Sequence, residues 1–291
     1  MEAKPALAPR VQQPSDDWTA SVSKCDDEHA FAAETSSMEP LEPQSLSEAK
    51  KRPDWPLWEK AIEEELASLK AAGMWEIVDA PKGVNVVGSK WVFRVKKDAA
   101  GNVIHYKACL VAQGFSQVLG VDYFDMFTPV AHLASIRTVL AFDAAEGYET
   151  GQIDIKAAYL NGELTENEVI FMKQAPGYEE VGEDGVVKVL RLWKSLYRLK
   201  QAGKRWYQKL VAIMMKLVFS LCEGDQVVLY RRCERTHVLI VMLVHVDDCR
   251  IVGKTKALVV RFKVKIAKFV DITDMGELHW ILGIEVCRIH E

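Results

Sequence analysis

The chain has 291 residues, of which 49% are hydrophobic, and its formal net charge is −4. A chain of this length can bury one large core or two small ones. The near balance of charge disfavours a protein that only coats nucleic acid, since neutralisation of phosphates dominates such binding.

The remaining composition speaks against two further classes. The longest apolar run, 238–244, is far shorter than the about 20 residues that a membrane-spanning helix needs, so we expect a buried strand and no membrane partner. The six cysteines form no CxxC pair and no Cys/His spacing that suits zinc. With no signal peptide in front of them, they are interpreted as reduced thiols of an intracellular protein.

Residues 1–52 differ in composition from the rest of the chain. They hold ten acidic and six basic side chains, whereas the remaining residues hold 31 of each, so the net charge lies in this segment. The segment is rich in Ala, Pro, Ser, Glu and Asp and has no hydrophobic periodicity. It is predicted to be a disordered linker or tail, and residues 53–287 are predicted to form the folded domain.

The first half of that domain begins with a helix over 54–73, because apolar residues recur at helical spacing and Gly73 supplies a stop. Apolar runs at 75–81 and 89–115 predict strands and a hairpin that carries basic side chains. Residues 134–147 predict a helix, and 149–164 a strand that ends in a turn at Asn161-Gly162.

The second half predicts two short strands, 169–173 and 189–193, and then a loop and helix over 194–219. Apolar segments at 227–232, 237–244 and 249–253 predict an antiparallel sheet, with two carboxylates at the turn before the last of them. A helix near 255–270 precedes a final segment at 275–286.

The two carboxylates at that turn, Asp247 and Asp248, are costly to keep beside an apolar core unless a cation compensates their charge. A two-metal phosphoryl-transfer site would need a further carboxylate from a neighbouring strand. Asp154, at the end of a short strand and beside a turn of small residues, is the best candidate. The alternative is that the pair is ordinary solvated turn chemistry, which Asp favours.

Five strings, in order, resemble the reverse-transcriptase region of copia-type long-terminal-repeat retrotransposons. The resemblance runs from about Trp58 to Val286. Its strongest parts are KWVFRVKKDAAGNVIHYKACLVAQGFSQVLGVDYFDMFTPV (90–130), QIDIKAAYLNGEL (152–164), LWKSLYRLKQAGKRWY (192–207), LVHVDD (243–248) and MGELHWILGIEV (275–286).

The resemblance implies an α+β right-hand polymerase, with an antiparallel palm sheet backed by helices and fingers built mostly before residue 150. Asp154 then matches the family's first catalytic aspartate, and Asp247 and Asp248 match the pair in its Tyr-Val-Asp-Asp turn. Their role would be to hold two Mg²⁺ ions, for which Mn²⁺ can substitute, and hard carboxylate oxygens suit such ions.

The resemblance also implies contacts with the incoming dNTP. The carbonyl of Ile155 would complete a metal shell, Tyr159 would lie under the sugar and exclude a 2′ hydroxyl, and Lys107 would contact the triphosphate. The bland alternatives are a core aromatic at a sheet edge for Tyr159 and a solvated charge for Lys107.

A basic cluster with aromatic neighbours follows the third string. Lys200, Lys204, Arg205 and Trp206 predict a patch that binds the backbone of the template, by charge and by stacking. The alternative for Trp206 is a buried side chain at the start of a helix.

The chain departs from the family's pattern at several positions. Cys109 replaces an arginine, and with it a strong phosphate donor, and His245 replaces the tyrosine before Val-Asp-Asp. Arg198 replaces a glycine, and Gly203 a proline. Arg250 stands where the family is usually apolar, so it must face solvent or find a partner.

The leading hypothesis is an RNA-directed DNA polymerase that takes a primed RNA or DNA template and dNTPs, in association with other parts of a Pol polyprotein. The alternative is an inactive remnant that at most binds nucleic acid, and a third is an unrelated interaction domain. We also expect an incomplete thumb and no RNase H domain. The compartment, a cytoplasmic particle or the nucleus, is left open.

Overall fold

A computed structural model describes residues 42–98, 101–183, 185–233, 239–281 and 284–286. Residues 1–41 of the expected tail, residues 99–100 of the expected hairpin and the first residues of the strand expected at 237–244 lie outside the described part. None of the helices in the described part is long and apolar enough to span a membrane.

The helical elements follow the expected order, although two of them are shorter than the patterns predict. They are α1 (Leu46–Ala49), α2 (Trp55–Ala71), η2 (Gly114–Ser116), α3 (Leu133–Glu146), η3 (Ala158–Asn161), α4 (Ala202–Lys216) and α5 (Lys256–Ile266).

In the residues that the structure describes, fourteen strands form four sheets. They are β1 (Trp75–Val78), β2 (Val86–Val87), β3 (Ser89–Lys97), β4 (Val103–Ala112), β5 (Glu149–Ile155), β6 (Ile170–Lys173), β7 (Val189–Leu192), β8 (Ser220–Leu221), β9 (Val228–Arg232), β10 (Leu239–His245), β11 (Asp248–Gly253), β12 (Ile272–Gly276), β13 (Trp280–Ile281) and β14 (Ile284–Glu285).

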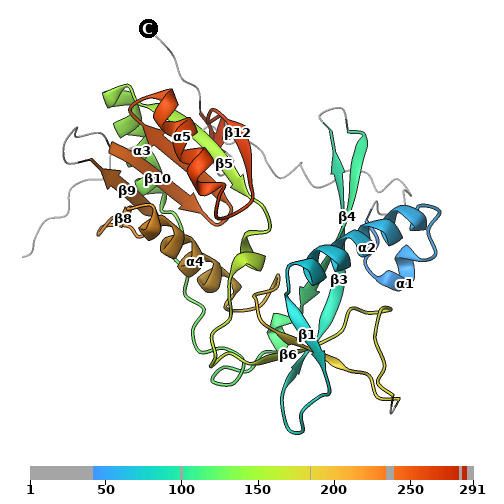
Figure 1. Ribbon diagram of the computed structural model, residues 1–291. Coiled ribbons are helices and arrows are strands. Elements are labelled where there is room, and N and C mark those ends of the chain that lie inside the picture. The colour runs from blue at the N-terminus through green and yellow to red at the C-terminus, as the bar shows by residue number, and fades with distance from the viewer. Residues whose placement is uncertain (1–41, 99–100, 184, 234–238, 282–283, 287–291) are drawn as a thin grey trace, which may run out of the picture. The chain divides into compact units, whose positions relative to one another are not determined.

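The largest sheet has six antiparallel strands in the order β12-β5-β11-β10-β9-β8. Met242 and Val244 of β10 share a core cluster with residues of α4 and α5, whereas Val241 and Leu243 pack with residues of α3 on the other face. Figure 1 shows α3 and α5 on opposite sides of this sheet. Burial on both faces explains why β10 is continuously apolar rather than alternating. The prediction of an antiparallel sheet backed by helices is confirmed.

The N-terminal half is built around the β3–β4 hairpin. Helix α2 packs on it through Trp58. The centroid of the Trp58 ring lies 5.2 Å from that of Phe93 and 4.6 Å from that of Tyr106, in edge-on geometry. Such pairs add about 0.5–1.5 kcal/mol each beyond the area that they bury. A four-stranded sheet in the order β1-β7-β6-β2 contributes to the same core.

Residues 42–52, which the sequence assigned to the tail, are part of this fold. A carboxylate oxygen of Glu42 accepts from the backbone N–H of Val95 at 3.0 Å, and Ala49 of α1 is fully buried. Because these contacts are made by single side chains spaced along a polar segment, they leave no hydrophobic period in the sequence.

Helix α4 is held close to the segment that follows β5. A Cβ atom on Gly162 would lie 2.8 Å from the backbone nitrogen of Trp206, so this position needs glycine for close approach. The indole N–H of Trp206 then donates to the carbonyl oxygen of Val246 at 2.7 Å. Trp206 therefore joins α4 to the loop between β10 and β11.

This hydrogen bond makes a stability prediction. Trp206→Phe should lower the free energy of unfolding by about 1 kcal/mol more than Trp58→Phe does, because only the former breaks a hydrogen bond, the partly buried one to the carbonyl oxygen of Val246. Both indoles are buried, and Nε1 of Trp58 has no hydrogen-bond partner among the described residues. The control thus removes a similar volume without breaking a hydrogen bond. Equal losses for the two variants in urea unfolding would contradict the assignment.

Candidate active site

Three carboxylates meet where β5 and the β10–β11 hairpin end side by side. Asp154 of β5 is the register partner of Asp248, the first residue of β11. Asp247 precedes it in the turn, is exposed, and accepts through its backbone carbonyl from the N–H of Ile155 at 2.8 Å. The structure therefore brings together the three aspartates that the sequence singled out.

The turn itself has only two residues, Val246 and Asp247, between the paired residues His245 and Asp248. Val246 has φ +58°, which is uncommon for a β-branched residue and strained. Its carbonyl oxygen is held by Trp206 and that of Asp247 by Ile155. These two hydrogen bonds hold the strained turn in place and so fix Asp247.

The carboxylates repel one another. Partial burial, and then the charges of Asp247 and Asp248, raise the pKa of Asp154 above its ordinary value, while Lys96 and Lys107 act in the opposite direction. A divalent cation would relieve this repulsion, and a set of carboxylate oxygens fits Mg²⁺ or Mn²⁺. In the described residues, however, no three such side chains are already placed around a common metal position.

One of the three aspartates already has partners for both of its oxygens. Oδ1 of Asp248 accepts from Nε2 of Gln152 at 2.7 Å, and Oδ2 accepts from a guanidinium N–H of Arg250 at 2.9 Å. The fit to a metal is therefore direct for Asp154 and Asp247, and it requires rearrangement for Asp248.

The β3–β4 hairpin presents a basic face to this region. Arg94 and Lys107 are register partners, and Lys96 lies two residues from Arg94, so the three side chains share one face. Arg94 forms an ion pair with Glu42, whereas the charges of Lys96 and Lys107 act to lower the pKa of Asp154. Cys109, two residues from Lys107, belongs to the same face. The cysteine thus stands among the basic groups, as the family's arginine would.

A hollow of about 420 Å³ lies beside the turn between β10 and β11. It is lined by Tyr159, Arg198 and Lys200 and by Val244 and Val246 of the β10–β11 hairpin. Burial and the nearby Asp247 raise the pKa of Tyr159, which keeps its hydroxyl protonated. Tyr159 therefore faces the space next to the aspartates rather than lying wholly in the core.

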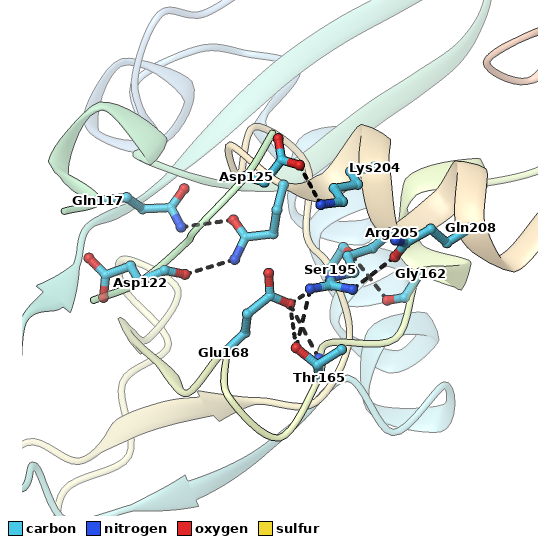
Figure 2. A network of polar contacts seen from close by, with 11 residues as sticks. Gln117, Asp122, Asp125, Gly162, Thr165, Glu168, Ser195, Lys204, Arg205 and Gln208 are labelled. Atoms are coloured by element: carbon cyan, nitrogen blue, oxygen red, sulfur yellow. Dashed lines mark hydrogen bonds and ion pairs between the residues drawn. The ribbon is translucent and has the colours of Figure 1, made fainter. Parts of the chain in front are cut away.

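The basic cluster at the start of α4 is largely occupied by protein contacts (Figure 2). Nζ of Lys204 lies 2.6 Å from Oδ2 of Asp125, and Nε of Arg205 lies 2.6 Å from Oε2 of the buried Glu168. Trp206 is 2% exposed, so it is the buried helix-start residue of the alternative interpretation and cannot stack on a base. Of the predicted patch, only Lys200 is exposed and lines the hollow.

We did not predict Lys96, Gln152 or the partner of Arg250 from the sequence. Period-two alternation offered a signal for Gln152 and Arg250, since each lies two residues from an aspartate and hence on the same face of its strand. No comparable signal identified Lys96, because a hairpin with several lysines does not indicate which of them faces the site.

A protein-family model described as "Reverse transcriptase (RNA-dependent DNA polymerase)" matches residues 72–291. Over 247 residues, or 85% of its length, the chain is 38% identical to the Retrovirus-related Pol polyprotein from transposon TNT 1-94 of Nicotiana tabacum. Over 80% of its length, the chain is also 34% identical to the Retrovirus-related Pol polyprotein from transposon RE1 of Arabidopsis thaliana. The chain spans 18% and 16% of those two polyproteins.

The match covers the β3–β4 hairpin, the three aspartates and the six-stranded sheet, and the similarity to the transposon polyproteins extends over most of the chain. The chain therefore belongs to the reverse transcriptase (RNA-dependent DNA polymerase) family.

Proposed function

We propose that this chain is the fingers and palm of an RNA-directed DNA polymerase that extends a primer by two-metal nucleotidyl transfer. The observation that carries the proposal is the meeting of Asp154, Asp247 and Asp248 at adjoining strand ends, beside an open hollow. In such a reaction, the primer 3′ oxygen attacks the α-phosphorus of a dNTP and pyrophosphate leaves.

Asp154 and Asp247 are the proposed ligands of two Mg²⁺ ions, with Asp248 and the carbonyl oxygen of Ile155 as further candidates. Bound ions of this kind activate the attacking oxygen and neutralise charge on the phosphates. The protein's share is positional. The strained turn places Asp247 beside β5, because its carbonyl is tied to the N–H of Ile155. Because this carboxylate is already held in place, it does not have to reorganise when the transition state forms.

The basic face of the β3–β4 hairpin is the proposed site for the triphosphate, with Lys107 and Lys96 as its charged contacts. Both lysines oppose the rise in the pKa of Asp154, which supports their proximity to the catalytic carboxylates. Tyr159 is the proposed contact for the dNTP sugar. Lys200, exposed at the edge of the hollow, is the proposed contact for the template backbone.

The proposal predicts that Asp247→Asn abolishes extension of a DNA primer on an RNA template. Loss of a metal ligand removes several kcal/mol of transition-state stabilisation, so the rate should fall by about a thousandfold or more. A chelator should have the same effect on the parent, and Mn²⁺ should restore activity. The control is Asp79→Asn, the same change at an exposed position outside the site. Extension by Asp247→Asn at the parent's rate would refute the proposal.

A second candidate function is that of an inactive remnant that retains the fold and at most binds nucleic acid. Arg198 supports it, because its φ of +67° is a left-handed conformation that favours the family's glycine. Glu65 supports it as well. Burial raises the pKa of this half-buried carboxylate, and its charge helps to raise the pKa of Cys109. No described residue forms an ion pair with Glu65. An arginine at position 109 would give Glu65 that partner.

The two candidates differ in what reversion does. Arg198→Gly should raise the free energy of unfolding by about 0.5–1 kcal/mol through relief of backbone strain, whereas Arg198→Ala, which keeps a Cβ atom, should not. If the chain is a remnant, only Cys109→Arg combined with Arg198→Gly will extend a primer. If it is a working polymerase, the parent will extend one too. Equal stability of the glycine and alanine variants would contradict the strain argument.

A further inference from the structure

Arg250 is the most deeply buried positive charge beside the aspartates. Its side chain is 3% exposed, and one guanidinium nitrogen donates both to Oδ2 of Asp248 at 2.9 Å and to the carbonyl oxygen of Trp280 at 3.0 Å. Its other two nitrogens are buried without a hydrogen-bond partner among the described residues. Burial lowers the pKa of Arg250, and the adjacent Asp248 opposes this effect.

The register explains why this contact forms. Asp154 is paired with Asp248, and Gln152 with Arg250, so the four side chains form a block on one face of the β5–β11 pair. On β13, Trp280 supplies its carbonyl oxygen to the buried guanidinium. Within this block, Asp248 has a donor on each oxygen, from Gln152 and from Arg250.

We infer that Arg250 is a positioning residue that binds Asp248 as an internal cation and leaves Asp154 and Asp247 as the metal ligands. The inference rests on the proposed two-metal function, which it deepens by dividing the roles of the three aspartates. An ion that recruited Asp248 would have to displace a guanidinium that has no other anionic partner in the described residues. Breaking one side of a buried ion pair leaves an uncompensated charge and is strongly unfavourable.

The consequence is a site that binds divalent ions more weakly than three carboxylates would permit. The side chain of Arg250 supplies the charge that a metal would otherwise provide to Asp248. Replacing Arg250 with an uncharged side chain of similar length should free Asp248 and strengthen metal binding.

The test is a titration with Mn²⁺ alone, followed by electron paramagnetic resonance of the free ion, on the full chain without nucleic acid. Arg250→Met should bind Mn²⁺ about tenfold more tightly than the parent, which corresponds to the loss of one charge-assisted hydrogen bond that competes for Asp248. Lys263→Met is the control, because it removes another buried cation, one that lies on α5 and pairs with Asp274 instead. Its affinity for Mn²⁺ should stay within about twofold of the parent's.

A second comparison measures Mn²⁺ affinity in single variants of the parent, so this reading does not depend on the stability of Arg250→Met. In the parent, Asp248→Asn should leave Mn²⁺ affinity nearly unchanged, while Asp247→Asn should weaken it strongly. Without metal, Asp248→Asn should lower the Tm of the parent, because it leaves the buried guanidinium of Arg250 without an anionic partner. The same change should lower the Tm much less in the Arg250→Met background, where that guanidinium is absent. A loss of Mn²⁺ affinity in Asp248→Asn as large as that in Asp247→Asn would overturn the inference.

These outcomes separate the inference from the proposed function. Tighter Mn²⁺ binding by Arg250→Met supports the inference even if no variant extends a primer. Extension by the parent, combined with the same Mn²⁺ affinity in the parent and in Arg250→Met, would uphold the function and overturn the inference. In an active chain, Arg250→Met should also lower the Mg²⁺ concentration that gives half-maximal extension.

Discussion

The arrangement of the site depends on how the two-residue turn between β10 and β11 is held. The carbonyl oxygen of Val246 accepts from the indole of Trp206, and that of Asp247 accepts from the N–H of Ile155. The first bond ties the turn to α4, and the second ties it to β5. Since Val246 is held at an unfavourable positive φ, these bonds keep a conformation that the turn would not adopt alone.

Charge in this protein is balanced overall and separated locally. Beyond residue 52 the chain has equal numbers of acidic and basic side chains, yet three carboxylates converge at one end of the sheet, and their mutual repulsion must be offset. The structure offsets it by two routes. Arg250 neutralises Asp248 from within the protein, and the lysines of the β3–β4 hairpin act on Asp154. The net charge of the chain carries none of this information.

The sequence predicted those parts of the fold that depend on local periodicity and on adjacent residues. The sheet around β10, the helices that cover it and the convergence of Asp154 with Asp247 and Asp248 follow from apolar runs, turn residues and the family's strings. The roles of Arg205 and Trp206 were mispredicted, because a basic residue next to an aromatic one suggests nucleic acid, whereas the partners Glu168 and Val246 are remote in sequence. The contact between Arg250 and Asp248 was missed for a different reason. The need for a partner was clear, but burial by β13 could not be foreseen.

The placement of β5 in the sheet has a consequence for the order of folding. Strand β5 lies between β12 and β11, and Gln152 bonds to Asp248 across 96 residues of chain. Closing so long a loop costs entropy before the contact repays it, so such pairings form slowly compared with the local β10–β11 hairpin. During synthesis, Asp154 is therefore made long before its register partner Asp248, and the pair cannot form until β11 has been made. The cluster of three aspartates is complete only when most of the described chain has been made.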